Sequence, residues 1–114
     1  MHSYDRSLRF YAIFALVIFL ASCVKRQEAK GDPVGGKALF DYTCEACHYA
    51  NSTVARAGPG LAGLYKWKTL PNGDAVTDAN VERFIRDGSN LMPGYRNKIS
   101  KEEMSNLIAY LRTL

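Results

Sequence analysis

The apolar side chains of the C-terminal half recur with the period of an α-helix. The clearest stretch lies at the end of the chain, where four positions follow the spacing i, i+3, i+4, i+7 of one buried helix face: Met104, Leu107, Ile108 and Leu111. Ser100 and Glu103, three residues apart, form the capping-box pattern that opens a helix. We therefore predict a C-terminal helix that begins after Ser100 and packs Met104 into the core.

Two further helices are predicted upstream of this one. The first lies near residues 35–47. The second lies near residues 79–87, with Thr77 or Asp78 as its N-cap and Gly88 after its last residue.

The fold class that follows is all-α. A Pro-Asn-Gly-Asp sequence at residues 71–74 marks a turn, and no stretch has a convincing strand pattern. We expect three to four helices joined by long loops. A chain of 114 residues has room for one small domain, and such domains usually need a disulfide, a metal or a bound cofactor for stability.

The longest unbroken apolar run lies near the N-terminus and has a different character. Residues 10–20 follow Arg6 and Arg9, which is the layout of a secretory signal. As a helix the run would reach only about 16 Å, against about 30 Å for the hydrocarbon core of a bilayer. A secretory signal is therefore the better interpretation than a membrane-spanning helix.

Residues 20–23, Leu-Ala-Ser-Cys, resemble the lipobox of bacterial lipoproteins, which implies cleavage before Cys23 and lipidation of that residue. An ordinary cleaved signal and an uncleaved anchor are the alternatives. We accordingly expect a signal peptide at residues 1–22, a lipidated cysteine and flexible polar tether at 23–33, and a folded domain at 34–114. On this hypothesis the protein is exported and held at a membrane through Cys23.

The net charge of +4 does not indicate a nucleic-acid partner. Residues 33–114 carry ten Lys and Arg against eight Asp and Glu, in interspersed order and without a basic run. A nucleic-acid surface would need clustered cations. We therefore expect none.

The strongest chemical signal is the sequence Cys44-Glu45-Ala46-Cys47-His48. Cys-x-x-Cys-His is the attachment motif of c-type haem: each thiol can add to one vinyl group, and the adjacent histidine can ligate the iron. The motif predicts one covalently bound haem c, held by Cys44 and Cys47, with His48 as an axial ligand.

Three other interpretations of the motif have less support. A structural zinc site would need a fourth ligand, which the cluster lacks. A thioredoxin-like dithiol would need a βαβ setting, whereas a helical pattern precedes the motif. A disulfide between the two cysteines would be strained and would leave His48 unexplained. With Cys44 and Cys47 assigned to haem and Cys23 to lipid, no cysteine is left over.

The second axial ligand is predicted to be Met92. His2 lies in the signal, so His48 would be the only histidine of the exported protein. Met104 belongs to the apolar stripe of the last helix, whereas Met92 lies in a Leu-Met-Pro-Gly-Tyr loop whose proline and glycine favour a fixed turn. A methionine in plain core contact is the alternative for Met92.

Residues 35–114 resemble a small class I cytochrome c, beyond the haem motif itself. Gly36 and Phe40 match positions on the family's N-terminal helix, and Leu107 and Tyr110 match their partners on its C-terminal helix. Physically, a glycine lets two helices cross closely while aromatic rings fill the crossing. The resemblance implies an all-α cytochrome c fold around the haem.

The same resemblance extends to Gly58, Pro59 and Leu61, which match a Gly-Pro-x-Leu segment. In the family the proline carbonyl accepts a hydrogen bond from the axial histidine, which implies that role for Pro59 toward His48. Tyr95 replaces a phenylalanine common in related sequences, and its hydroxyl needs a partner. The residues that bind the haem propionates stay open among four candidates: Tyr65, Lys66, Trp67 and Lys68.

These features together predict an electron carrier and not an enzyme. With His48 and Met92 both bound, no coordination position is left for a small-molecule substrate, and electrons would pass between redox protein partners outside the cytoplasm. The competing hypotheses are a haem enzyme or gas sensor with a displaceable Met92, and a metal or interaction module without haem. The first is weakened because the exported chain has no second histidine for acid–base chemistry.

Overall fold

The first helix, α2 (Pro33–Thr43), begins where the sequence supplies both a cap and a proline. In this computed structural model, which describes residues 30–114, the Asp32 carboxylate accepts hydrogen bonds from the backbone N–H groups of Val34 and Gly35, both at 3.0 Å. Pro33 occupies the first helical position, where its missing N–H has no cost. The predicted signal, Cys23 and most of the predicted tether lie outside the described residues.

The helix predicted at residues 35–47 exists, but both of its predicted ends were wrong. It starts two residues earlier, at the Asp32 cap, and ends four residues earlier, at Thr43. The Phe40 carbonyl accepts from the N–H groups of both Cys44 and Glu45, at 2.7 and 3.0 Å, so the last turn widens and the regular ladder stops. The Cys-x-x-Cys-His motif therefore follows the helix as a series of turns.

The other two α-helices confirm the predicted boundaries closely. In α3 (Asp78–Asp87) the Thr77 hydroxyl caps the first turn by accepting from the Asn80 N–H at 3.2 Å, and Gly88 ends the helix with φ +71°. α4 (Lys101–Leu111) opens with the predicted capping box: Ser100 Oγ accepts from the Glu103 N–H at 3.2 Å, and Glu103 Oε2 accepts from the Ser100 N–H at 2.8 Å.

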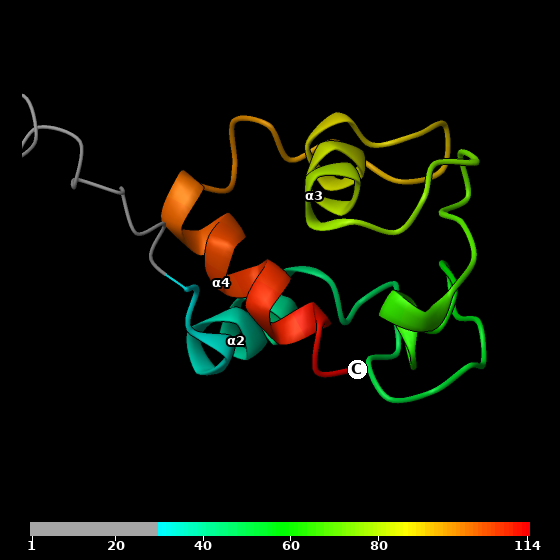
Figure 1. Cartoon of the computed structure of the whole chain (residues 1–114), viewed down its shortest axis with the longest axis horizontal. Coiled ribbons are helices and arrows are strands. Elements are labelled where there is room, and N and C mark those ends of the chain that lie inside the picture. The colour runs from blue at the N-terminus through cyan, green and yellow to red at the C-terminus, as the bar shows by residue number, and fades with distance from the viewer. Residues whose placement is uncertain (1–29) are drawn as a thin grey trace, which may run out of the picture.

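α2 and α4 cross closely at the end of the domain where the described chain begins (Figure 1). A Cβ atom on Gly36 would lie 1.9 Å from the Asn106 carbonyl oxygen and 2.8 Å from Tyr110 Cβ, so this crossing requires glycine. The rings of Phe40 and Tyr110 meet beside it with centroids 5.5 Å apart at 60°. The predicted helix crossing is thus confirmed.

The core lies between these two helices and extends toward α3. Its most deeply buried side chains are Phe40, Met104 and Leu107, each about 1% exposed, which confirms that Met104 is a packing residue. Val81 and Ile85 bring the buried face of α3 against the same cluster. Together with the helix crossing, this packing confirms the predicted all-α class, and no strand is found anywhere in residues 30–114.

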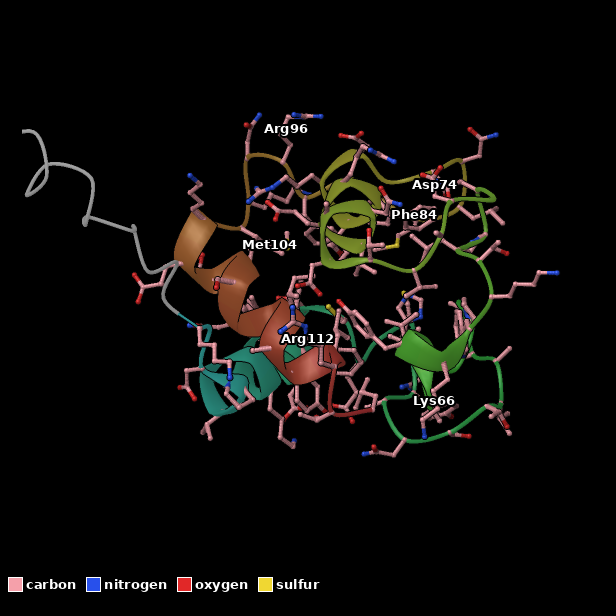
Figure 2. All side chains as sticks on the ribbon, in the orientation of Figure 1. Lys66, Asp74, Phe84, Arg96, Met104 and Arg112 are labelled. Carbon is pink, nitrogen blue, oxygen red and sulfur yellow. The ribbon has the colours of Figure 1, made fainter. Side chains whose placement is uncertain are left out.

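Between α2 and α3 the chain runs through loops and one short 3-10 helix, η1 (Leu64–Lys66). Asp78, at the start of α3, joins this region to the rest: it accepts from the Tyr65 hydroxyl at 2.9 Å and forms an ion pair with Arg112. Arg112 lies at the C-terminal end of α4 (Figure 2). The predicted turn at residues 71–74 is present, with Gly73 at φ +88° donating to the Leu70 carbonyl at 2.9 Å. Among residues 30–114, no helix is both long enough and apolar enough to cross a membrane.

Candidate functional site

The Cys-x-x-Cys-His turn presents two free thiols and an imidazole at the end of α2. The N–H groups of Cys47 and His48 both donate to the Cys44 carbonyl, at 3.0 and 2.9 Å, which folds the five residues into a compact turn. Cys44 is half-buried and Cys47 is exposed. Burial, with a smaller contribution from Cys47, raises the pKa of the Cys44 thiol to about 11, so this group stays a neutral thiol near pH 7.

His48 is fixed in one orientation by the segment that follows residue 57. Its Nδ1 lies 2.8 Å from the Pro59 carbonyl oxygen. Because a carbonyl can only accept, Nδ1 carries the proton and donates, and the lone pair is on Nε2. This is the contact that the resemblance implied for Pro59.

Gly58 makes that orientation possible. A Cβ atom on Gly58 would lie 2.4 Å from His48 Cε1 and 2.9 Å from both ring nitrogens, so the imidazole rests directly on the glycine backbone. The Gly58 N–H also donates to the Cys47 carbonyl at 2.8 Å. Any larger residue at this position would displace the ring from its place beside Cys47.

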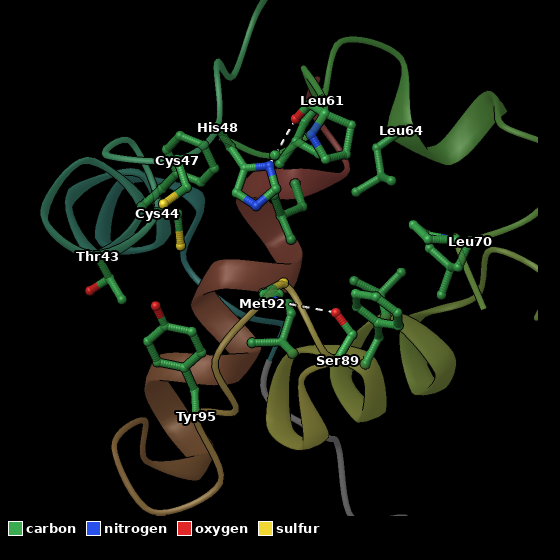
Figure 3. Close-up of a pocket in the computed structure, with 18 of the residues that line it drawn as sticks. Thr43, Cys44, Cys47, His48, Leu61, Leu64, Leu70, Ser89, Met92 and Tyr95 are labelled. Atoms are coloured by element: carbon green, nitrogen blue, oxygen red, sulfur yellow. Dashed lines mark hydrogen bonds between the residues drawn. The ribbon is translucent and has the colours of Figure 1, made fainter. Parts of the chain in front are cut away.

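A cavity of about 240 Å³ opens between His48 and Met92. Figure 3 shows these two side chains on opposite sides of the cavity, with the cysteines at its edge beside His48. The lining combines helix residues such as Phe40 and Leu107 with loop residues such as Trp67, and it contains no Asp, Glu, Lys or Arg. The space is therefore apolar, with the imidazole of His48 and the thioether of Met92 facing each other across it.

The loop that carries Met92 is closed by its own hydrogen bonds. Ser89 Oγ accepts from the N–H groups of Leu91 and Met92, at 3.3 and 3.2 Å, and the Ser89 N–H donates to the Met92 carbonyl at 2.8 Å. Gly88 packs against this loop so tightly that a Cβ atom there would lie 2.5 Å from the Met92 carbonyl oxygen. Met92 is thus half-buried on a preformed turn, while Leu91 beside it is 96% exposed.

The residues present fit a covalently held haem. A flat, largely apolar macrocycle needs an apolar cavity, thiols at its edge and side chains that can ligate iron from both faces, and side chains of these kinds line the cavity. A zinc site has less support, because in the described part of the chain no three His, Cys, Asp or Glu side chains gather into a metal-binding group. The cysteines also follow a helix and not a strand, unlike a thioredoxin-like dithiol.

Of the four residues considered for the propionates, the structure brings only Trp67 to the cavity. The Tyr65 hydroxyl is already bonded to Asp78 at 2.9 Å, and Lys66 and Lys68 are exposed and do not line the cavity. Trp67 Nε1 lies 3.4 Å from the Ala62 carbonyl oxygen, a long hydrogen bond.

Sequence reasoning missed two residues, Ser89 and Arg56, that support the Met92 loop and the Cys-x-x-Cys-His turn. Ser89 could have been noticed, since a serine that precedes two loop residues often bonds their backbone. Arg56, which contacts the Cys-x-x-Cys-His turn from eleven residues away, gives no such local signal.

Comparison with known proteins identifies the group to which this arrangement belongs. The family described as cytochrome C oxidase, cbb3-type, subunit III matches residues 31–111, well over half of the chain. Cytochrome c6 of Limnospira maxima is 30% identical over 81 residues, which cover 71% of this chain and 91% of that protein.

Two other relatives agree. A cytochrome c6-like protein of a Nostoc species is 24% identical over 99 residues, covering 87% of this chain and 86% of the relative. Cytochrome c2 of Rhodopila globiformis is 28% identical over 100 residues, covering 74% and 94%. The chain therefore belongs to the monohaem class I c-type cytochromes, small all-α electron carriers that are not enzymes and that bind one haem c covalently.

Proposed function

We propose that this protein transfers single electrons between protein partners outside the cytoplasm, with its haem held by Cys44 and Cys47 and ligated by His48 and Met92. The observation that carries the proposal is the placement of His48 and Met92 on opposite sides of one apolar cavity, beside the two free thiols. Haem c, when bound, supplies an iron that changes its oxidation state by one electron.

The residues around the cavity support an iron whose two axial positions are both occupied by protein side chains. The Pro59 carbonyl fixes the proton of His48 on Nδ1 and so leaves Nε2 as the donor atom. The Ser89 hydrogen bonds hold the Met92 turn closed, which keeps its thioether in place. A thioether is a soft ligand that favours ferrous iron, so we expect a raised reduction potential.

A redox titration of the haem-loaded protein, with and without carbon monoxide, tests the ligand set. We expect a single one-electron transition and no rapid CO binding by the reduced protein at neutral pH. Met92→Ala should lower the potential and allow CO to bind. Met104→Leu, which changes the buried methionine of α4, is the matched control and should do neither.

The same titration separates this proposal from its main competitor. Rapid CO binding by the unmodified protein would favour a haem sensor or enzyme in which Met92 is readily displaced. If the Met92→Ala variant has the same reduction potential as the unmodified protein, Met92 is not a ligand of the iron. If the exported protein lacks haem altogether, the assignment of Cys44 and Cys47 fails with it.

We further propose that residues 1–22 are a signal peptide, that Cys23 is lipidated, and that the predicted tether (23–33) links the domain (34–114) to the membrane through its first part, because residues 31–33 already belong to the fold. The support is the sequence itself, together with the way the chain enters the fold. The Asp32 N–H donates to Asn106 Oδ1 at 2.7 Å, and Gly31 lies against the Ser105 backbone. The described chain therefore enters the fold beside the middle of α4.

Cys23→Ala provides the test of anchoring. The variant should move from the membrane fraction to the soluble fraction after cell breakage, while its haem spectrum stays unchanged because Cys23 takes no part in haem attachment. Persistent association of Cys23→Ala with membranes would instead indicate an uncleaved N-terminal anchor.

A further inference from the structure

Arg56, in the loop that follows residue 49, contacts the Cys-x-x-Cys-His turn through its side chain. Its Nη1 donates to the backbone carbonyl of Glu45, between the two cysteines, at 2.8 Å. Its guanidinium carbon also lies 5.3 Å from the centroid of the Tyr49 ring, directly after His48. The cation thus contacts one residue before Cys47 and His48 and one residue after them.

The backbone around Arg56 strengthens this connection. The Arg56 N–H donates to the Gly58 carbonyl at 2.8 Å, and the Gly58 N–H donates to the Cys47 carbonyl at 2.8 Å. Gly58 in turn supports the His48 ring. A charge-assisted hydrogen bond and a cation–π contact on the side chain therefore reinforce the backbone bonds that place the histidine.

The charge on Arg56 is also uncompensated. Within residues 30–114, no carboxylate forms an ion pair with it, and its contact with Glu45 is to the backbone and not to the side chain. Five other cations of the domain are each paired with an acid: Lys37, Arg83, Arg86, Arg96 and Arg112. A free positive charge is therefore held against the segment to which the cofactor is attached.

We propose that Arg56 is a positioning residue that fixes the haem-attachment turn and whose charge raises the reduction potential of the haem. The proposal rests on the proposed function, since it needs the haem on Cys44, Cys47 and His48. Oxidised iron carries one more positive charge than reduced iron, so a nearby cation disfavours oxidation. The effect should weaken with salt, because Arg56 is on the surface.

Redox titrations of three variants at low and high ionic strength test this. Arg56→Gln removes the charge but keeps an amide that can donate to the Glu45 carbonyl. We expect it to lower the equilibrium ratio of reduced to oxidised protein at fixed solution potential by roughly twofold to tenfold at low salt, less at high salt. A tenfold change corresponds to 59 mV for a one-electron couple.

Arg56→Lys keeps the charge, so its reduction potential and the salt dependence of that potential should stay close to those of the unmodified protein. Lys101→Gln is the matched control, since it removes one exposed cation from the start of α4, outside the cavity lining, and should leave the potential unchanged. A positioning role without the charge effect would instead change the spectrum of the haem ligands in Arg56→Lys as much as in Arg56→Gln.

The proposal is overturned if Arg56→Gln has the potential of the unmodified protein at low salt, or if Lys101→Gln lowers it equally. It is also overturned if Arg56→Lys and Arg56→Gln lower it by the same amount. These outcomes are distinct from failure of the proposed function, which would appear in the unmodified protein as absent haem or as rapid CO binding.

Discussion

The helix crossing and the cavity are built from some of the same residues but differ in how complete they are. Between α2 and α4 the backbones touch at Gly36 and the Phe40 and Tyr110 rings fill the remaining space. On the cavity side, Phe40 and Leu107 line an open space that extends to the loops carrying His48 and Met92. The helix pair is therefore fully packed where α2 and α4 cross, and it faces an open cavity on its other side.

This difference indicates what each region contributes to stability. The crossing buries apolar side chains of the two helices against each other. The loops that carry His48 and Met92 are organised by local hydrogen bonds, such as those of Ser89, but they have a cavity where a core would be. A haem in this cavity would serve as redox centre and would also complete the core, so we expect folding and cofactor binding to be coupled.

Removal of the haem should have the largest effect. We expect the Cys44→Ala/Cys47→Ala double variant, exported without haem, to be largely unstructured, because its loops lose the group that they pack around. Far-UV circular dichroism should show loss of most helical signal and no cooperative thermal transition. Any residual amide protection by hydrogen exchange should be confined to α2 and α4. A cooperative native fold in this variant would contradict the coupling.

A defect at the crossing should have a smaller but clear effect on the haem-loaded protein. In Gly36→Ala the new Cβ would meet the Asn106 carbonyl oxygen at 1.9 Å, which forces the helices apart. We expect a loss of about 1–3 kcal/mol in the free energy of unfolding, measured by denaturant titration. The reduction potential should change little, since the substitution lies outside the cavity lining.

Gly35→Ala is the matched control for this substitution. A Cβ atom at Gly35 would meet only side-chain atoms, of Asp32 and Asn106, at 3.2 and 3.3 Å. Replacing a helical glycine by alanine favours the helix by up to about 1 kcal/mol, so Gly35→Ala should be near neutral or slightly stabilising. Equal destabilisation by both variants would mean that the crossing is not the source of the effect.

The two regions also differ in how far the sequence alone predicts them. The helices are predictable because their signals are local: the Ser100–Glu103 capping box, Thr77 before α3 and Gly88 after it all act within one turn. The end of α2 was not predictable in this way, because no glycine or proline stands at residues 44–47 to mark where the ladder stops.

The same reasoning applies to the candidate site. The proposed ligands, His48 and Met92, follow from a motif and from the contrast between the loop methionine and the helical one. Their supports do not, because Arg56 meets Glu45 and Pro59 meets His48 across eleven residues of irregular loop. The Pro59 contact was expected only through resemblance to a family. Contacts of this kind depend on the path of the whole loop, which no local pattern specifies.

The smallest expected effect concerns the helix side of the molecule, where α2 and α4 cross. It is the loss of stability at acid pH through Glu103, at the start of α4. The backbone N–H of Ser100, followed by its side chain, lowers the pKa of Glu103 below the usual 4.5. The ionised carboxylate therefore stabilises the fold fully above pH 4.5, and this contribution is lost as the pH falls through the lower folded pKa. Glu103→Gln, which keeps an acceptor for the Ser100 N–H, should be slightly less stable than the unmodified protein at neutral pH.

The difference in the free energy of unfolding between Glu103→Gln and the unmodified protein should disappear as the pH falls below 4.5. Unfolding followed by circular dichroism at several pH values measures this difference. Glu102→Gln is the control, because Glu102 lies in the same turn of α4 but forms no capping-box contact. Its stability difference should show no such closure beyond the general helix-dipole effect. Because Glu103 is exposed and does not line the cavity, its titration should leave the reduction potential unaffected. A parallel change in potential would show that the helix side and the cavity side are more tightly coupled than their contrasting packing implies.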